Sequence, residues 1–339
     1  MNSVEICAGA GGQALGLEMA GFEHAALVEI EPPACATLLD NRPHWNVISG
    51  DVKEFDGKPY RGVELVCGGV PCPPFSVAGK QLGSDDERDL FPEALRLAAE
   101  IKPQAVMLEN VRGLLDPKFA SYRESVEAEL DRLGFTTFWR LLHASDYGVS
   151  QLRPRAICVA VKRNIAQFFK WPELSPPPPT VGELLLDLMA EREWDGAYAW
   201  SLGADAIAPT LVGGSRKHGG PDLGPTRAKL AWARLGVDGL GLANEAPGPD
   251  FEGMPKITVK MAARIQGFPD AWKIHGKKTA AYRQVGNAFP PPVAAAVGRQ
   301  IKIAIEAGAA RSAKKIVLPR QGKIASANVG GVVIAQSSA

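Results

Sequence analysis

Two kinds of segment alternate through the first half of the chain, and this alternation limits the folds open to it. Short apolar runs have the length of buried strands, and stretches with a helical pattern lie between several of them. The strand-like runs are residues 4–7, 25–29, 45–48, 63–67, 105–109, 135–142 and 156–161, and the helix-like stretches are 11–20, 32–39, 92–101 and 119–133. The pattern predicts an α/β fold with a doubly wound, mostly parallel sheet, whose ligands bind beyond the carboxyl ends of the strands.

A proline run interrupts this alternation. Residues 172–179 read PELSPPPP, which neither a helix nor a central strand accommodates, so they are typical of a linker. Residues 180–282 are richer in Gly and polar loop sequence and favour a smaller, loop-dominated domain. Residues 283–311 then predict an Ala-rich helix that starts at prolines. A length of 339 residues agrees with one large domain and one smaller domain.

The charges nearly cancel overall but are segregated along the chain. Residues 1–150 carry 13 Lys and Arg against 23 Asp and Glu, whereas residues 253–323 carry 14 against 2. The formal net charge is +1. A basic segment behind an acidic first half favours either a face for a polyanion or an ordinary solvated surface, and the charge alone leaves both interpretations open.

Composition indicates an intracellular protein without a metal site. No apolar run reaches the roughly 18 residues of a membrane span, and the N-terminus lacks the pattern of a signal peptide, so we expect a cytoplasmic protein. The chain starts just before its first strand-like run, from which we expect no N-terminal regulatory domain. An odd number of cysteines without a CxxC pair argues against disulfides and zinc: Cys7, Cys35, Cys67, Cys72 and Cys158.

A glycine-rich turn follows the first strand-like run. Residues 5–21 read EICAGAGGQALGLEMAG, in which Gly9, Gly11 and Gly12 permit a sharp turn and close approach to a ligand. A dinucleotide site requires GxGxxG, and the last spacing here differs, so S-adenosylmethionine is the competing ligand. Glu29 and Asp51 end the next two strands. We expect Glu29 to accept hydrogen bonds from ribose hydroxyls and Asp51 to accept one from an adenine amino group.

Four further side chains predict a nucleophilic reaction on a ring. Cys72 lies in GGVPCPPFS, where flanking prolines are expected to hold an exposed thiol. Glu109 ends a strand in an apolar setting, which favours a protonated carboxyl that donates to a ring nitrogen. Arg153 and Arg155 begin another strand and are expected to face one side, toward a phosphate or a base carbonyl. Together, a thiol, a carboxyl and two guanidiniums suit one reaction on a cytosine ring. In that reaction, addition of a thiolate to C6 makes C5 able to take a methyl group.

These motifs resemble those of the cytosine-C5 DNA methyltransferases. The similarity covers EICAGAGG, GGVPCPPFS, ENV, QLRPR, ITVKMAARIQGFPD and QVGNAFPPPV, in family order from residue 5 to about residue 298. It implies a seven-stranded S-adenosylmethionine-dependent methyltransferase fold. The implied domains are catalytic and cofactor-binding at 1–178 plus 283–312, target-recognition with a hinge at 179–282, and a tail at 313–339.

The resemblance also implies roles for individual residues. Cys72 is the C6 nucleophile, Glu109 contacts N3 and the exocyclic amine, Arg155 holds the pyrimidine O2, and Arg153 lies nearby on phosphate or pocket. The cofactor, which leaves as S-adenosylhomocysteine, is contacted by Cys7, Ala8, Gly9, Ala10, Gly11, Gly12, Glu29, Ile30, Asp51, Val52, Pro71, Asn287 and Ala288. The expected contacts to flipped-out double-stranded DNA are Ser76, Lys80, Arg88, Arg216 and Lys217.

Two other functions remain open from the sequence. A tRNA cytosine-C5 methyltransferase shares the chemistry, although the CFTxxY signature of that branch is absent. A catalytically inactive DNA-binding relative is the second, although all central catalytic residues are present. We expect a monomeric bacterial modification enzyme, with a separately acting restriction endonuclease as its possible partner.

Overall fold

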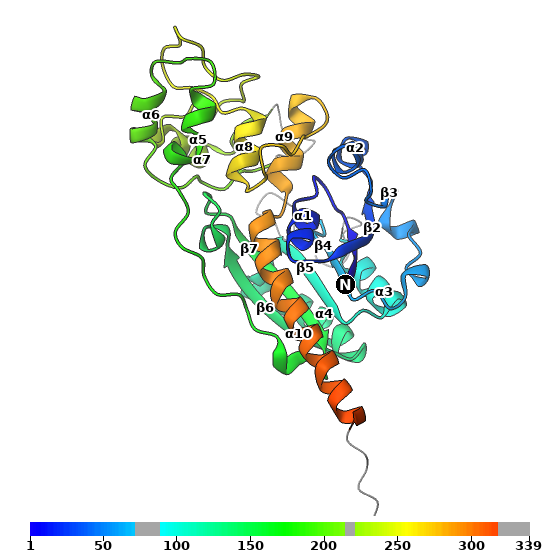
Figure 1. Cartoon of the computed structure of the whole chain (residues 1–339). Helices are drawn as coiled ribbons and strands as arrows, with labels where there is room; N and C mark the ends of the chain where they lie inside the picture. Colours follow the sequence, from blue (N-terminus) through cyan, green and yellow to red (C-terminus); the bar gives the residue numbers. More distant parts are fainter. Residues whose placement is uncertain (72–88, 214–220, 318–339) are drawn as a thin grey trace, which may run out of the picture.

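The protein is described by a computed structural model that covers residues 1–71, 89–213 and 221–317 (Figure 1). Seven strands form one sheet in the order β3-β2-β1-β4-β5-β7-β6. The strands are β1 (Asn2–Ile6), β2 (Glu23–Glu29), β3 (Val47–Ser49), β4 (Leu65–Gly68), β5 (Ala105–Val111), β6 (Phe135–His143) and β7 (Pro154–Lys162). Each strand lies at one of the seven apolar runs of the sequence.

The sheet is mostly parallel and doubly wound, which confirms the predicted fold class. The neighbouring strands from β3 to β5 pair in parallel, whereas β7 is antiparallel to both β5 and β6. The chain moves from β1 outward through β2 and β3, and then returns to place β4 on the other side of β1. This change of direction opens a crevice at the carboxyl ends of β1 and β4, where open α/β sheets bind their ligands.

Helices cover both faces of the sheet. On one face, apolar side chains of α3 (Phe91–Ile101) and α4 (Ala120–Arg132) pack on Val4, Ile6 and Val66. On the other face, α1 (Gly12–Met19) and the long α10 (Pro291–Val317) pack on Leu65 and Met107. Figure 1 shows α10 running along the sheet. Helix α2 (Pro32–Asn41) follows β2, and short 3₁₀ helices are η1 (Val52–Glu54), η2 (Lys58–Tyr60), η5 (Arg112–Leu115), η6 (Pro117–Phe119), η7 (Ala144–Tyr147) and η8 (Ala166–Phe168).

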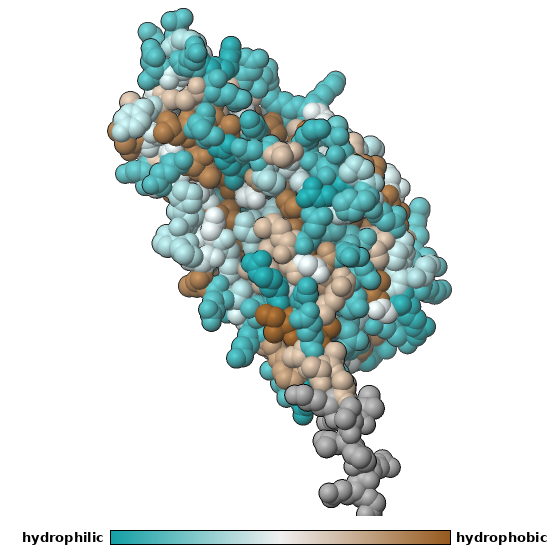
Figure 2. Space-filling view, viewed as in Figure 1, coloured by the Kyte–Doolittle hydropathy of each residue, from teal (hydrophilic) through white to brown (hydrophobic). Residues whose placement is uncertain are grey.

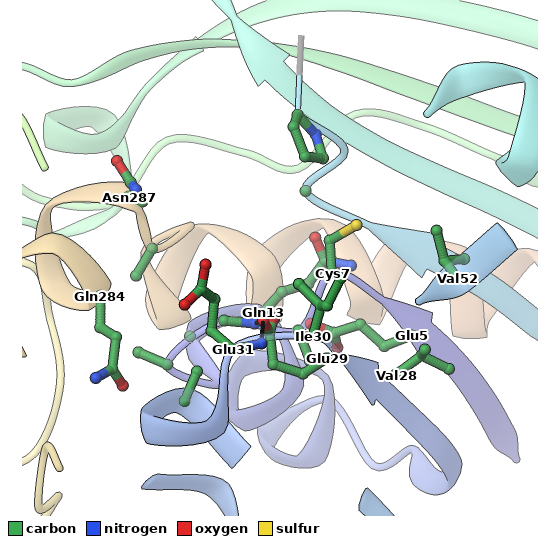
Figure 3. A pocket seen from close by; sticks show the side chains of 18 of the residues that line it. Glu5, Cys7, Gln13, Val28, Glu29, Ile30, Glu31, Val52, Gln284 and Asn287 are labelled. Atoms are coloured by element: carbon green, nitrogen blue, oxygen red, sulfur yellow. Dashed lines mark hydrogen bonds between the residues drawn. The ribbon is translucent and has the colours of Figure 1, made fainter. Parts of the chain in front are cut away.

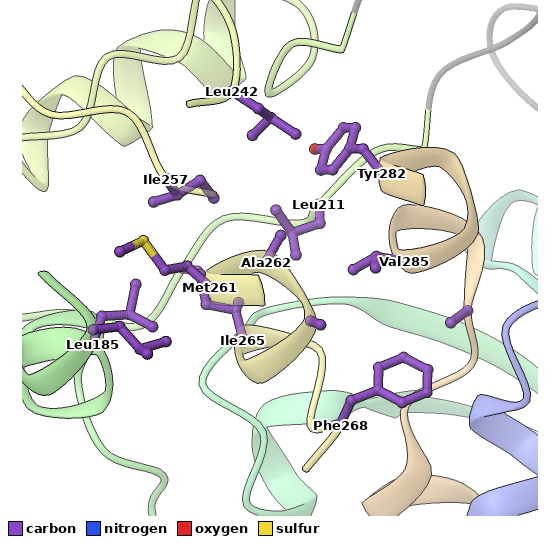
Figure 4. Close-up of a cluster of buried hydrophobic side chains, with 14 of the residues drawn as sticks. Leu185, Leu211, Leu242, Ile257, Met261, Ala262, Ile265, Phe268, Tyr282 and Val285 are labelled. Atoms are coloured by element: carbon purple, nitrogen blue, oxygen red, sulfur yellow. The ribbon is translucent and has the colours of Figure 1, made fainter. Parts of the chain in front are cut away.

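The region after the proline run is built from short helices and loops. Its helices are α5 (Val181–Met189), α6 (Ala197–Gly203), α7 (Thr226–Arg234) and α8 (Val259–Ile265). Thr180 begins α5 with a reciprocal capping box to Glu183, which explains why the helix starts directly after the prolines. Leu185, Ile257 and Met261 form its apolar core, which continues to Tyr282 of α9 (Lys278–Asn287) (Figure 4).

The predicted helix at 283–311 is two helices in the structure. Residues 283–287 belong to α9, and α10 begins at Pro291 and continues to Val317, past the expected start of a tail at residue 313. The break falls at Phe289–Pro290–Pro291, because proline has no amide hydrogen and disfavours a helical residue before it.

Figure 2 shows hydrophilic side chains over most of one face of the molecule, with apolar side chains in scattered patches. Within the described ranges, no helix is both long and apolar enough to cross a membrane. The proposed domain division at residues 178, 282 and 312 remains a prediction. In the structure the chain passes from the sheet into the helical region after β7 and returns through α9 into α10.

Candidate active site

A pocket of about 640 Å³ opens at the carboxyl edge of the sheet (Figure 3). Its walls come from the ends of β1, β2, β4 and β5, the glycine turn, and helix α9. Of the cofactor-binding residues predicted from the sequence, all except Gly11 line it: Cys7, Ala8, Gly9, Ala10, Gly12, Glu29, Ile30, Asp51, Val52, Pro71, Asn287 and Ala288. The catalytic candidate Glu109 lines the same pocket.

The glycine turn curls the chain between β1 and α1. Gly9 and Gly11 have positive φ angles of 55° and 80°, which glycine adopts without strain. A Cβ on Gly11 would meet Leu38 and Trp272, so this residue faces the protein and not the pocket. The predicted contact of Gly11 with the cofactor stays a prediction, and in the structure Gly11 permits the turn. A side chain on Gly12 would clash with the carbonyl oxygen of Phe289, where α1 approaches the α9–α10 junction.

The Glu29 carboxylate is held in place by the main chain. Its Oε2 accepts from the Gly9 amide at 2.7 Å and its Oε1 accepts from the Glu31 amide at 2.8 Å. Burial raises the pKa of Glu29, and these amide donors act against the rise. A carboxylate offers about four acceptor positions, so each oxygen keeps capacity for a further donor from a ligand. This geometry suits the two hydroxyls of a ribose.

An apolar slot lies next to Glu29. Ile30, with 60% of its surface exposed, and the buried Val52 both line the pocket. Asp51, just before Val52, accepts from the Lys53 amide at 3.0 Å, which fixes its carboxylate at the start of η1. An exposed apolar side chain beside a fixed acceptor suits a flat heterocycle that carries an amino group.

Glu109 and Arg155 form an ion pair on neighbouring strands. The Arg155 Nε lies 2.6 Å from Glu109 Oε1, and both side chains are largely buried. Glu109 lies two residues before the end of β5, and Arg155 is the second residue of antiparallel β7, where it faces Val111, so the sheet itself brings the two side chains together. The expected apolar setting of Glu109 is therefore wrong, because a guanidinium contacts its carboxylate. Burial lowers the pKa of Arg155, and the attraction of Glu109 acts against that change.

Arg153 lies within electrostatic range of Arg155 and Glu109, but its side chain is enclosed by the protein. Residue 153 precedes β7, and its guanidinium is completely buried. It donates to the carbonyl oxygens of Leu211, Gly286 and Ala288 at 2.8–2.9 Å. No surface remains for a phosphate or a base, so the prediction that Arg153 contacts either group is wrong. The residue instead joins β7, the segment before residue 214 and the α9–α10 junction.

The segment that leads to Cys72 is fixed up to Pro71. Asn110, next to Glu109, donates its amide to the carbonyl of Val70 at 3.0 Å. A Cβ on Gly69 would lie 3.3 Å from Glu109 Oε2, so this segment runs directly past the carboxylate. The nucleophile candidate and the predicted DNA contacts lie outside the described residues: Cys72, Ser76, Lys80, Arg88, Arg216 and Lys217.

The pocket contains residues that sequence reasoning missed. A position at or next to a strand end was a signal that could have identified some of them: Glu5, Val28, Glu31, Gly50, Lys53 and Gly69. Residues from other elements carried no such signal. The missed residues from other elements are Gln13, Pro33, Ala34, Leu90, Ala280, Arg283, Gln284 and Phe289. Among the described residues, no group of His, Cys, Asp and Glu is arranged to hold a metal ion.

Glu5 at the base of the pocket makes stability depend on pH. Its side chain is 1% exposed, and burial followed by repulsion from Glu29 raises its pKa well above the ordinary value. Above about pH 4.3 the unfolded chain releases this proton while the folded chain keeps it, so rising pH costs stability until the folded pKa is passed. Replacing Glu5 with Gln removes the titration. We expect the variant to gain thermal stability relative to the parent between pH 5 and pH 8, and melting curves that stay parallel would contradict this.

Comparison with known proteins places the chain near enzymes that methylate DNA. The sequence profile of the C-5 cytosine-specific DNA methylases matches residues 1–208 and 231–303. The Type II methyltransferase M.NgoMIV of Neisseria gonorrhoeae is 60% identical over 303 residues, which cover 88% of this chain and 96% of that protein. The Type II methyltransferase M.NaeI of Lentzea aerocolonigenes is 57% identical over 308 residues, covering 89% and 75%.

Solved structures share the fold at lower sequence identity. A putative DNA modification methyltransferase encoded within an E. coli prophage aligns with a TM-score of 0.63 and 22% identity, over 90% of this chain and 99% of that one. A DNMT2 variant from Spodoptera frugiperda aligns with a TM-score of 0.62 and 18% identity, also over 90% and 99%. At such identities the likeness concerns the architecture alone.

Proposed function

The chain belongs to the C-5 cytosine-specific DNA methylase family, and we propose which of its residues carry out that activity. The enzyme transfers a methyl group from S-adenosylmethionine to C5 of cytosine in DNA. The observation that carries the assignment of residues is one pocket whose wall contains both the Glu29 carboxylate and the Glu109–Arg155 ion pair. A nucleoside ligand and a pyrimidine therefore meet at one edge of the sheet.

The described residues fit S-adenosylmethionine. Glu29 has free acceptor positions for the ribose hydroxyls, and Ile30 and Val52 form an apolar slot for adenine with Asp51 at its edge. The sulfonium of the bound cofactor supplies an activated methyl group. The acidic lining favours such a cation, since Glu29, Glu31 and Asp51 all line the pocket.

Cys72 is the proposed nucleophile. Pro71, the residue before it, lines the pocket beside the fixed segment 69–70, and Glu109 lies on the same wall. Addition of the Cys72 thiolate to C6 forms a carbon–sulfur bond and places electron density on C5. Glu109 holds N3 and the exocyclic amine, and Arg155 holds O2. After methylation, loss of the C5 proton and departure of the thiolate restore the aromatic ring.

Base flipping is part of the proposal. C5 and C6 of a stacked cytosine are not accessible to a pocket at the edge of a sheet, so the base must leave the double helix, at a cost of a few kcal/mol. The basic excess of residues 253–323 in the sequence supports a DNA-facing surface formed by this segment. We place phosphate contacts at Ser76, Lys80 and Arg88 and base contacts at Arg216 and Lys217, on the resemblance alone.

The biological setting follows from the relatives. Because both relatives at 57–60% identity are Type II methyltransferases, we infer that this enzyme modifies DNA in the bacterial cytoplasm beside a separate restriction endonuclease. We also propose that it acts as a monomer on double-stranded DNA. An inactive relative is disfavoured by the intact Glu109–Arg155 pair.

Substrate choice is tested by offering both nucleic acids to the purified enzyme. Labelled methyl groups from S-adenosylmethionine should appear on plasmid DNA and not on total tRNA. Label on tRNA alone would overturn the proposal. Bisulfite sequencing of a plasmid from an expressing host then identifies the methylated cytosines, which should recur within one short sequence.

A further inference from the structure

Arg283 places a positive charge without a counter-ion at the wall of the pocket. It lies on α9, where Ala280, Arg283, Gln284 and Asn287 line the pocket at the spacing of one helix face. Figure 3 shows Gln284 and Asn287 on this helix, beside the pocket. Arg283 is half-buried, and among the described residues its guanidinium has neither an ion pair nor a hydrogen bond. Its five donors are therefore available to a ligand.

The neighbour of Arg283 on the same helix face is engaged in a different way. Thr37 donates to Gln284 Oε1 at 2.7 Å, and Gln284 Nε2 donates to the His275 carbonyl at 2.7 Å. The Gln284 amide thus joins α9 to α2 and to the loop before α9. Arg283 makes no such structural contact, so the packing of the helix does not explain its charge.

The acids that line the pocket are also engaged elsewhere. Glu29 accepts from two main-chain amides, and Asp51 accepts from a third. Glu109 pairs with Arg155. Neutralisation of Arg283 therefore falls to a bound group that brings negative charge. The cofactor is poorly suited to this task, because its sulfonium and ammonium outnumber its one carboxylate.

The main chain of α9 places Arg283 where the pocket meets the helical region after the proline run. A Cβ on Gly213 would lie 2.8 Å from the Arg283 carbonyl oxygen, and a Cβ on Gly286 would lie 2.4 Å from the Gly213 Cα. Gly213 belongs to the region that we predict to recognise DNA. A DNA strand that contacts this region and sends a base into the pocket therefore passes close to Arg283.

We propose that the Arg283 guanidinium binds a phosphate that flanks the flipped-out cytosine. The planar fork of an arginine matches the oxygens of a phosphate, and the phosphate supplies the missing negative charge. The contact holds the extruded nucleotide while its base lies against Glu109 and Arg155. It carries no sequence information of its own. This inference rests on the proposed function, because it requires a base that leaves the double helix.

The test removes each partner of the contact in turn. Bisulfite sequencing supplies the methylated site, and duplexes of that site carry an uncharged methylphosphonate on the 5′ or the 3′ side of the target cytosine. Mobility shifts with S-adenosylhomocysteine present give the Kd of each duplex. We expect Arg283→Met to weaken the ordinary duplex by about tenfold, since a charged hydrogen bond is lost. Methylphosphonate on one side should weaken the parent chain by a similar factor and Arg283→Met by less than about twofold.

The salt dependence of DNA binding gives a second measurement. Loss of one phosphate contact should reduce the slope of log Kd against log salt by about one in Arg283→Met, whereas Arg283→Lys keeps the slope. Arg299→Met is the matched control, because it removes the same charge. Arg299 is exposed on α10, does not line the pocket, and has no ion pair among the described residues. That variant should keep the affinity and slope of the parent chain.

The possible results separate this contact from the proposed function. If methylphosphonate on either side weakened Arg283→Met as much as the parent chain, the proposal would be overturned. A tenfold loss of S-adenosylhomocysteine affinity with DNA binding unchanged would also overturn it, because the guanidinium would then bind the carboxylate of the cofactor. Failure of the parent chain to methylate DNA would refute the proposed function itself. Arg283→Gln serves as a second variant if Arg283→Met unfolds, and partial unfolding leaves the ratio of the two duplex affinities unchanged.

Discussion

A chain in which Cys72 is replaced by serine should bind DNA and yet transfer no detectable methyl group. We expect the rate to fall by a factor on the order of a thousand or more, as loss of a covalent nucleophile does elsewhere. The reason is the state of the attacking atom. A few per cent of a cysteine is thiolate at neutral pH, whereas a serine hydroxyl is hardly ionised and needs a base beside it.

The surrounding structure explains why no neighbour should replace Cys72. Glu109 is engaged with Arg155, and Asn110 is engaged with the Val70 carbonyl, so neither is poised to deprotonate a serine. Cys7 also lines the pocket, but burial and the nearby Glu29 carboxylate raise the pKa of its thiol. Within the described part of the chain, the pocket thus offers no second reactive thiolate.

The measurement combines label transfer with a DNA mobility shift on the same preparation. Cys158→Ala is the control, because Cys158 is buried within β7 and its side chain joins the apolar core away from the pocket. That variant should keep its activity, with a modest loss of stability. Full activity in Cys72→Ser would refute the mechanism, and loss of DNA binding in the same variant would show that Cys72 is needed for the fold.

The sequence predicted the fold from a pattern that depends only on burial. A strand in a parallel sheet covered on both faces reads as an apolar run, so each of the seven strands was visible. Residues at the ends of these strands, such as Glu29 and Asp51, were visible for the same reason. The position of helix α9 over the pocket could not be predicted in this way. It depends on packing against α8 and α2, and no local sequence pattern encodes that contact.

Two errors have a common physical cause. A spacing of two residues predicts the same direction for side chains on a strand, but it does not show that the guanidinium of Arg153, just before β7, is taken up by main-chain carbonyls of other segments. Glu109 was judged by its apolar neighbours in sequence, whereas its partner Arg155 comes from an antiparallel strand more than forty residues later. Sequence spacing reports direction within an element and not the contacts between elements.

Replacing each of the two arginines of QLRPR by methionine should therefore have a different effect, one on stability and the other on methyl transfer. Arg153→Met leaves the buried carbonyls of Leu211 and Gly286 without this donor and removes one of two donors to Ala288, at a cost of about 3 kcal/mol or more. For a protein of this size, that loss corresponds to a melting temperature lower by roughly 4 °C or more. Arg155→Met removes the partner of Glu109 and should abolish methyl transfer while S-adenosylhomocysteine still binds.

Arg153 also belongs to a buried network that couples the two regions of the chain. Gln151 donates to Gln266 of the segment after α8 and accepts from the Leu211 amide, while Gln266 donates to the same Ala288 carbonyl as Arg153. Thermal melting and calorimetry on both variants separate the roles. If Arg153→Met melted like the parent chain but bound DNA weakly, the phosphate contact would have to be restored. A large loss of stability with cofactor affinity retained below the transition would instead establish Arg153 as the clamp between the sheet and the α9–α10 junction.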